Sequence, residues 1–307
     1  MKRIFVVLAA LGLSAAVAGA QDFNAAVDAF NAGAQAMETN KTEALAQFRT
    51  ALEQAQACTE AEAPELVAKC KSAIVGALVS IAKDQINEDA YDEALATLAE
   101  AKTAAAEYEE TEAAQELDTL IPNVYMRKGA TQLKAKDAAG AAATFKELTA
   151  IDPGNGKAQL LLGQALLQSG DMEGAVAALT KANELGEAQA PKLLSTTYLK
   201  KGQALLKAGK TAEAIESLEK SNSYVESANA YKLIGQAQTK SGKSAQALNA
   251  YKKYLELNPN AKDAADVALT IAMEAQKAGD KATAKEYYQK LAGTKHAAQA
   301  EAQLKAL

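Results

Sequence analysis

The stretch that decides the fold is residues 125–153, YMRKGATQLKAKDAAGAAATFKELTAIDP. A small residue, Gly129, stands twelve positions before Ala141, and Phe145 and Leu148 follow Ala141 at intervals of four and three. Residues spaced i, i+4 and i+7 lie on one face of an α-helix. The segment therefore predicts two helices, the first with a small contact residue and the second with one buried stripe. The closing proline is expected to end the second helix.

This pattern recurs along the chain, with a spacing of 34 residues from Gly129 to Gly163 and of 33 from Gly202 to Gly235, and with an insertion expected between Gly163 and Gly202. The small residue and the later alanine form the pairs Gly33/Ala44, Ala82/Ala94, Gly129/Ala141, Gly163/Ala175, Gly202/Ala214, Gly235/Ala247 and Ala272/Ala284. Four positions after each alanine stand Phe48, Leu98, Phe145, Leu179, Leu218, Tyr251 and Tyr288. Three positions further stand Ala51, Ala101, Leu148, Ala182, Ser221, Tyr254 and Leu291. A fixed period of this length predicts a repeat architecture in which the small residue lets two helices approach and the bulky residue fills the space beside it.

Glycines and prolines mark the joints between the predicted helices. Gly170, Gly209, Gly242 and Gly279 follow the first helix of their repeats, where a left-handed residue commonly ends a helix. All five prolines (Pro64, Pro122, Pro153, Pro191 and Pro259) are expected between repeats and outside helices, because a proline inside a helix costs about 3 kcal/mol.

Composition agrees with an all-helical chain. The 307 residues are rich in Ala, Leu, Glu, Lys and Gln, which are strong helix formers, and contain no Trp. Sparse β-branched and aromatic residues argue against a β-sheet protein, and the 49% hydrophobic content argues against disorder. The net charge of −5 excludes the basic footprint that nucleic acids and anionic membranes require.

The repeats resemble the tetratricopeptide repeat family. The pattern of an aromatic residue, Gly, Ala-x-x-x-aromatic and Pro is matched by Tyr125, Gly129, Ala141, Phe145 and Pro153, and again by Tyr231, Gly235, Ala247, Tyr251 and Pro259. The resemblance implies an all-α right-handed solenoid of about seven helix-turn-helix hairpins. It divides the chain into a signal peptide (1–20), degenerate N-terminal repeats (21–121), tetratricopeptide repeats (122–296) and a capping helix (297–307).

The resemblance also implies a concave groove, lined by the first helix of each hairpin, that binds a peptide or helix of a partner protein. Equivalent positions of the predicted first helices carry an amide column and a lysine column. The amides are Gln164, Gln203 and Gln236, and the lysines are Lys134, Lys207, Lys240 and Lys277. We expect these seven side chains to contact an acidic or C-terminal peptide segment.

A simpler explanation exists for the lysine column. Each lysine is predicted in the last turn of a helix, where the helix dipole favours a cation by about 0.3–1 kcal/mol without any ligand. The carboxylate clamp known in this family is not indicated, since only Asn229 and Lys232 fall near the positions it needs. The acidic run from Glu107 to Glu112 is expected to be a solvated helix end and loop.

The N-terminus predicts export. Lys2 and Arg3 precede an apolar run, and Ala18-Gly19-Ala20 matches the small-residue signal for cleavage after Ala20. The run is shorter than the roughly 20 residues of a spanning helix, so no membrane insertion is expected. We expect a periplasmic or secreted protein, similar to exported tetratricopeptide repeat proteins of Bacteroidetes.

Two cysteines, Cys58 and Cys70, stand twelve positions apart on either side of a predicted turn. In an oxidising compartment they predict a structural disulfide worth about 2–3 kcal/mol. No metal site is expected, because zinc needs more ligands than these two cysteines and the single histidine, His296, supply.

No catalytic or cofactor motif is present. No Ser/His/Asp set is expected, because the single histidine, His296, lies in a terminal repeat, and no phosphate-binding glycine loop occurs. The sequence therefore predicts a non-catalytic adaptor that binds an unidentified protein or peptide. The alternative is a self-associating envelope scaffold, in which the chain forms a homo-oligomer. Glycan binding is disfavoured because sugars stack on aromatic platforms and Trp is absent.

Overall fold

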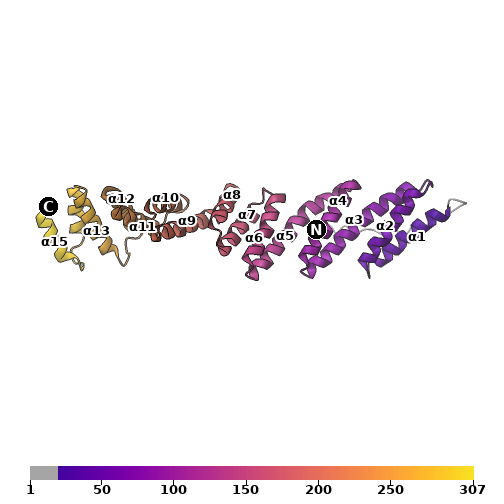
Figure 1. Ribbon diagram of the computed structural model, residues 1–307, viewed down its shortest axis with the longest axis horizontal. Helices are drawn as coiled ribbons and strands as arrows, with labels where there is room; N and C mark the ends of the chain where they lie inside the picture. The colour runs from indigo at the N-terminus through magenta and orange to yellow at the C-terminus, as the bar shows by residue number, and fades with distance from the viewer. Residues whose placement is uncertain (1–19) are drawn as a thin grey trace. The chain divides into compact units, whose positions relative to one another are not determined.

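The computed structural model describes residues 20–307, which contain fifteen α-helices and no β-strand (Figure 1). The residues divide into two compact units, one that ends at Pro153 and one that begins at Gly154. Within each unit, every helix packs against the next helix of the chain. The prediction of an all-α fold built from helical hairpins is confirmed.

The N-terminal unit holds three hairpins. Its helices are α1 (Ala20–Ala36), α2 (Lys41–Ala57), α3 (Ala63–Asn87), α4 (Tyr91–Glu107), α5 (Thr111–Lys134) and α6 (Ala138–Ile151). Among the first helices of the three hairpins, α3 also contacts α1 and α5. The predicted signal peptide lies outside the described residues, apart from its last residue, Ala20, at which α1 begins.

The C-terminal unit holds four hairpins and a final helix. Its helices are α7 (Gly156–Ser169), α8 (Met172–Glu184), α9 (Ala190–Lys207), α10 (Thr211–Tyr224), α11 (Ala228–Lys240), α12 (Ser244–Leu257), α13 (Ala264–Lys277), α14 (Lys281–Gln289) and α15 (Ala297–Ala306). The last of these lies within the segment expected to cap the repeats, residues 297–307.

The repeated stripe forms the core of both units. All seven alanines of the stripe and all seven bulky residues that follow them are buried, and so are the seven residues three positions further. The second helix of each hairpin therefore turns this one face inward, as its spacing predicts. Burying a Phe or Leu side chain stabilises the fold by about 1.5–3 kcal/mol, so the stripe supplies much of the hydrophobic stabilisation.

The small residue of the first helix is needed because the bulky residue lies directly against it. A Cβ atom on Gly163 would stand 2.6 Å from Cγ of Leu179. On Gly235 it would stand 2.7 Å from Cε1 of Tyr251. Real Cβ contacts are longer than this, so glycine permits an approach of the two helices that a larger residue would prevent.

The predicted left-handed turns are confirmed, and the N-terminal unit makes the same turns without glycine. Gly170, Gly209, Gly242 and Gly279 have φ between +71° and +90°. At the ends of α3, α4 and α5 the residues with positive φ are Asp89, Glu109 and Lys136, at 59° to 62°. At these three turns a residue with a side chain takes the left-handed conformation that glycine takes in the C-terminal unit.

The expectation that every proline lies outside helices is wrong for Pro122. This residue lies inside α5, a helix of 24 residues. Proline has no amide hydrogen, so the helix loses one hydrogen bond there, and the rest of the long helix keeps it continuous. Pro64 and Pro191 lie in the first turns of α3 and α9, where a missing amide hydrogen costs nothing. The boundary expected between residues 121 and 122 consequently falls within one helix.

The predicted disulfide between Cys58 and Cys70 is not present in the structure. Cys70 lies in α3 with its side chain fully buried in the apolar core of the N-terminal unit. Cys58 is the C-cap residue of α2, and its Sγ atom donates a hydrogen bond to the carbonyl oxygen of Gln54 at 3.2 Å. Burial raises the pKa of the Cys70 thiol to about 12.

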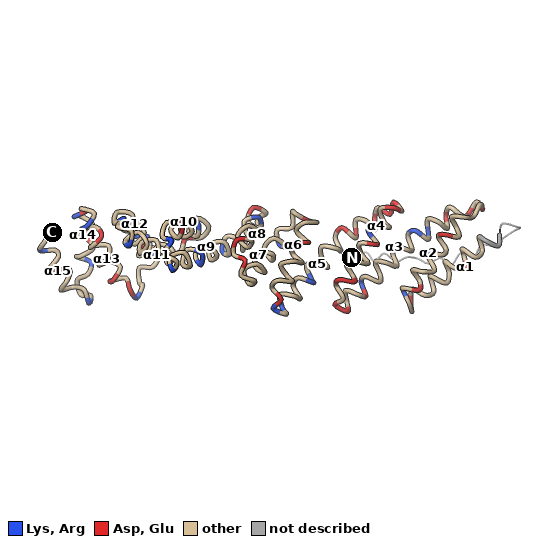
Figure 2. Tube along the Cα trace, viewed as in Figure 1, with Lys and Arg blue, Asp and Glu red and all other residues tan. Residues whose placement is uncertain are grey.

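Over residues 20–307, no helix is both long enough and apolar enough to cross a membrane. In the same part of the chain, no three His, Cys, Asp or Glu side chains come together in a metal-binding group. Figure 2 shows acidic and basic residues interspersed along the helices of each unit.

Candidate functional site

The four predicted groove lysines lie at helix ends. Lys134, Lys207, Lys240 and Lys277 are exposed residues in the last turns of α5, α9, α11 and α13. These are the positions at which the helix dipole alone favours a cation. Lys277 also has a partner within the chain, because its Nζ atom lies 2.7 Å from Oε1 of the buried Glu274. The geometry thus agrees with a structural role for Lys277.

The predicted amide column lies on the first helices, as expected. Gln164 on α7 and Gln203 on α9 are half-buried, and Gln236 on α11 is exposed. None of the seven predicted side chains lines either of the two cavities described below.

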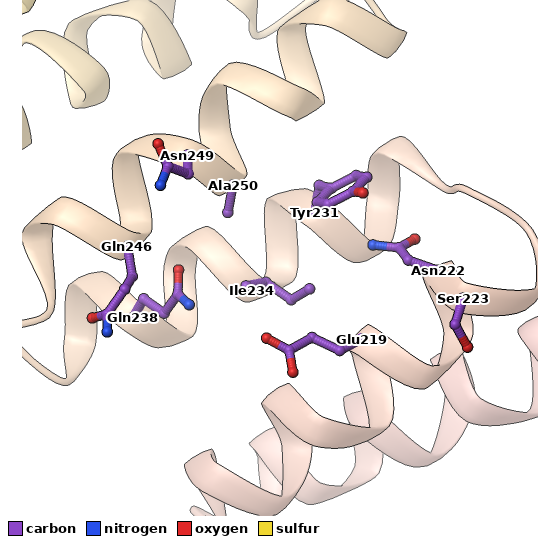
Figure 3. Close-up of a pocket in the computed structure, with 9 residues that line it drawn as sticks. All are labelled: Glu219, Asn222, Ser223, Tyr231, Ile234, Gln238, Gln246, Asn249 and Ala250. Carbon is purple, nitrogen blue, oxygen red and sulfur yellow. The ribbon is translucent and has the colours of Figure 1, made fainter.

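The C-terminal unit has a polar crevice of about 420 Å³ between α10, α11 and α12 (Figure 3). Tyr231, Ile234 and Gln238 of α11 line it. Gln236 lies two residues from both Ile234 and Gln238, and therefore points to the opposite side of α11 at 100° per residue. The crevice is not on the face that carries the predicted amide.

Two buried amide atoms in this crevice have no hydrogen-bond partner. Oδ1 of Asn222 accepts the backbone N–H of Ser227 at 2.9 Å, which leaves Nδ2 of Asn222 unpaired. Oε1 of Gln238 is likewise unpaired. Burial, followed by the hydrogen bond to Glu226, raises the pKa of Tyr231 at the rim of this crevice.

The N-terminal unit has a more apolar cavity of about 390 Å³ along α3. Ser72, Gly76, Val79 and Lys83 are spaced i, i+4, i+7 and i+11, so they lie on one face of α3 and line the cavity. Three of the four are small or apolar. This stretch of α3 therefore leaves space for another chain to approach the helix closely, and we refer to the cavity as the α3 groove.

The sides of the α3 groove come from the turn after α1, from Phe48 of α2 and from the start of α5. Met37, in the turn that follows α1, lines it on one side. On the other side stand Glu110, the N-cap residue of α5, and Glu112 and Glu116 in the first two turns of α5. Figure 2 shows acidic residues at the turn between α4 and α5. The sequence predicts only that the acidic run from Glu107 to Glu112 is solvated. Nothing in a single sequence shows which neighbouring helix this turn lies beside.

The α3 groove carries more negative than positive side chains. Nζ of Lys83 lies 2.9 Å from Oε1 of Glu116, so these two charges compensate each other. Glu110 makes no side-chain capping hydrogen bond to α5. Together with Glu112 it leaves a net negative rim on an otherwise apolar groove.

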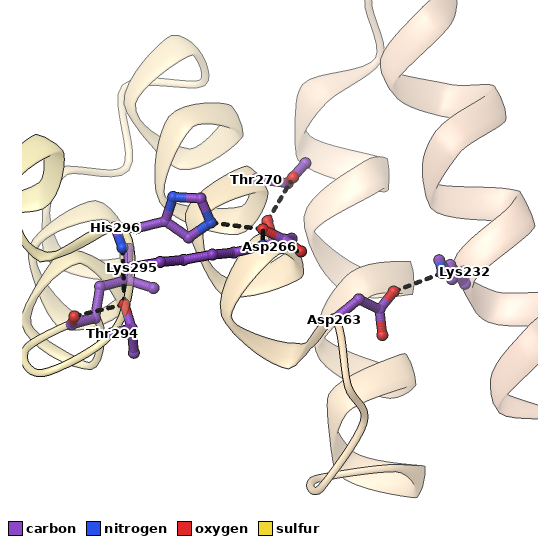
Figure 4. A network of polar contacts seen from close by, with 8 residues as sticks. Lys232, Asp263, Asp266, Thr270, Thr294, Lys295 and His296 are labelled. Carbon is purple, nitrogen blue, oxygen red and sulfur yellow. Dashed lines mark hydrogen bonds and ion pairs between the residues drawn. The ribbon is translucent and has the colours of Figure 1, made fainter.

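A polar network in the C-terminal unit has a structural role (Figure 4). Asp263, at the start of α13, lies 2.5 Å from Nζ of Lys232 on α11 and accepts a hydrogen bond from the Tyr254 hydroxyl. Asp266 lies 2.7 Å from Nζ of Lys295 and 2.6 Å from Nε2 of His296. These contacts join α13 to α11, α12 and the turn before α15.

The network also fixes ionisation states. The hydrogen bond from Lys232, followed by that from Tyr254, lowers the pKa of Asp263. Hydrogen bonds from Lys295 and then His296 lower the pKa of Asp266. Lys232, one of the two residues near clamp positions, is thus held by Asp263.

Comparison with known families identifies the repeat. Two family models described as tetratricopeptide repeat match residues 132–195 and residues 199–262. These segments span α6 to α12. Residues 132–195 and 199–262 are therefore tetratricopeptide repeats, and such repeats generally act as non-catalytic modules for protein–protein interaction.

Solved structures with a similar arrangement of helices include three named proteins. MamA is 23% identical over 58% of this chain and 94% of its own, with a TM-score of 0.36. PilF of Pseudomonas aeruginosa is 21% identical over 56% of this chain and 75% of its own, with a TM-score of 0.30. YrrB, a TPR protein with an unusual peptide-binding site, is 18% identical over 66% of this chain and 91% of its own, with a TM-score of 0.33. No curated protein sequence matches the chain. These low similarities carry no argument about the partner.

Proposed function

We propose that the protein is an exported, non-catalytic adaptor that binds a segment of a partner protein in the α3 groove. The observation that carries this proposal is the cavity of about 390 Å³, which is lined by one face of α3, the start of α5, Met37 after α1 and Phe48 of α2. In tetratricopeptide repeats the first helices line the binding groove, and α1, α3 and α5 are the first helices of their hairpins.

The composition of the groove suits a protein segment. Gly76, Ala73 and Ser72 give a floor without large side chains, so a helix or extended chain can approach the α3 backbone. Val75 and Val79 also line the cavity, with their side chains buried in the core beneath it. Ligand sites of this kind combine an apolar surface with a few polar groups at the edge.

Export is a second part of the proposal and rests on the sequence of residues 1–20. The charged start, the apolar run and the small residues before Gln21 are the features of a secretory signal. Mass spectrometry of the protein purified from its own cells tests this part. An N-terminus at Gln21 supports export, whereas an intact N-terminus contradicts it.

The binding proposal is tested by filling the groove. Ser72 is exposed and lines the cavity, so Ser72→Trp places a large ring in the groove without disturbing the core. Thr50→Trp places the same ring at an exposed position of α2 and serves as the matched control. The partner is isolated from envelope extract with the unmodified protein, identified by mass spectrometry and purified.

We expect Ser72→Trp to weaken binding of the purified partner at least tenfold and Thr50→Trp to leave it unchanged. Equal binding by both variants contradicts the groove as the site. Recovery of only the same chain, with dimerisation lost in Ser72→Trp, contradicts the adaptor and favours the self-associating scaffold.

A further inference from the structure

We infer that the α3 groove selects a basic amphipathic segment, one that carries Lys or Arg beside an apolar stripe. The inference rests on the proposed function and names the chemistry of its partner. It reverses the expectation of an acidic partner, which was based on the lysine column.

The first step is the charge of the lining. Four ionisable side chains line the groove, namely Glu110, Glu112, Glu116 and Lys83. The ion pair between Lys83 and Glu116, at 2.9 Å, uses the cation and one carboxylate. Two carboxylates remain for an incoming partner, and no cation of the lining remains for an acidic one.

The second step is that neither a capping hydrogen bond nor an ion pair explains the presence of Glu110 and Glu112. Glu110 is the N-cap residue of α5, but its carboxylate accepts no capping hydrogen bond from that helix. Neither residue takes part in an ion pair within residues 20–307. The ion pairs in this unit include Lys102 with Asp118 and Arg49 with Glu100. Proximity to a helix N-terminus stabilises a carboxylate, but this effect does not require that both carboxylates line a cavity.

The third step is the position of these charges relative to the apolar floor. Glu110 and Glu112 come from the α5 side, whereas partly exposed Met37 and Gly76 provide apolar lining above the buried Val75 and Val79. A helix with an apolar stripe seated on α3 would therefore need its cations on the flank that faces α5. This arrangement is that of a basic amphipathic helix lying in a groove.

The experiment uses a defined probe and the full mature chain. The probe is a fluorescein-labelled peptide of sequence KLAALKAALKAAL, which places Leu on one stripe and Lys beside it. A second peptide has every Lys replaced by Glu. Binding is measured by fluorescence anisotropy at low and at high salt.

Three variants separate the possible causes. Glu110→Gln with Glu112→Gln removes the two rim charges and keeps side-chain size. Glu93→Gln with Glu107→Gln makes the same change in net charge at acidic residues of α4 that do not line the groove. Ser72→Trp fills the groove. Thermal unfolding of every variant reports any structural role of the carboxylates.

The unmodified chain is expected to bind the Lys peptide and to bind the Glu peptide at least tenfold more weakly. The Glu110/Glu112 variant should lose about fivefold in affinity for the Lys peptide at low salt and less at high salt, with only a small decrease in the unfolding temperature from the lost interaction with the helix N-terminus. The Glu93/Glu107 variant should lose less than twofold.

Other outcomes overturn different parts of the account. Equal losses in the two charge variants, or equal binding of the two peptides by the unmodified chain, overturn the assignment of a basic partner. If Ser72→Trp still abolishes binding in those cases, the groove itself survives as the site. If Ser72→Trp leaves the binding of the Lys peptide unchanged, both the inference and the proposed groove fail.

Discussion

Phe145 lies against Gly129 so closely that a Cβ atom on residue 129 would stand 2.5 Å from Cζ of the ring. Phe145 is fully buried, so the ring has no open side toward which it can move. The pair joins α5 to α6 and is one instance of a contact that recurs in other hairpins of the chain.

The first prediction follows from this contact. Gly129→Ala should lower the free energy of unfolding by about 1–2 kcal/mol, because overpacking costs more than the gain in helix propensity. Urea unfolding followed by circular dichroism measures the change. In a Phe145→Leu background the same substitution should cost clearly less. Additive effects of the two changes would show that the contact is not under strain.

A second prediction concerns the turns made without glycine. Lys136 has φ of +62°, a conformation that costs a residue with a side chain about 1–2 kcal/mol. Lys136→Gly should therefore raise the free energy of unfolding by up to about 1 kcal/mol, after the greater entropy of glycine in the unfolded chain is subtracted. Gly209→Lys, at φ of +77°, should do the reverse. Changes of the same sign in both variants would contradict the conformational explanation.

The third prediction is a loss of stability in acid. Glu274 is buried, and although burial acts to raise the pKa of its carboxyl, hydrogen bonds from Lys277 and Ser244 lower it overall. The unfolded chain therefore takes up this proton first, near its ordinary pKa of about 4.3, as the pH falls. The stabilisation is present above that pH and is lost as the pH falls toward the lower pKa of the folded state.

Glu274→Gln tests this linkage. At about pH 7 it should destabilise the fold by about 1–3 kcal/mol, because a charged hydrogen-bond acceptor is lost. It should also make the urea midpoint less sensitive to acid than that of the unmodified chain. Some sensitivity will remain, since the pKa values of Asp263 and Asp266 are lowered as well. An unchanged acid dependence would contradict the role of Glu274.

The fourth prediction concerns thiol reactivity. Because burial raises the pKa of Cys70 to about 12, very little thiolate exists at neutral pH. Iodoacetamide should alkylate Cys70 in urea but not in the folded chain, as measured by peptide mass spectrometry. Rapid alkylation of Cys70 in the folded chain would contradict its burial. A mass that is lower by two hydrogens, with neither cysteine alkylated in urea, would show that the predicted disulfide forms after all.

The sequence predicts the fold well because the fold is local and repeated. One stripe of Ala, bulky residue and third residue is enough to define each second helix, and its burial in all seven hairpins is confirmed. The position of Pro122 inside a helix is not predicted, because a long helix such as α5 tolerates one lost hydrogen bond when packing holds both sides. The left-handed turns at Asp89, Glu109 and Lys136 are not predicted either, since their conformation is imposed by packing and not by residue type.

The candidate site is less predictable from sequence. Lys207 and Lys240 form a regular pattern, but helix ends produce the same pattern without a ligand. Glu110 and Glu112 belong to the site only because α5 begins beside α3, and this neighbourhood arises from the stacking of hairpins. Their sequence context, an acidic run at a helix start, is the same whether the residues face water or a groove.

The most direct test of the central claim is photo-crosslinking in the cells that produce the protein. p-Benzoylphenylalanine is placed at Ser72 in the α3 groove, at Gln236 in the amide column, or at Thr50 on the outer face of α2. The account predicts a dominant crosslink to one partner protein from position 72 and none to that partner from position 50. A partner captured from position 236 and not from position 72 would contradict the α3 groove as the binding site.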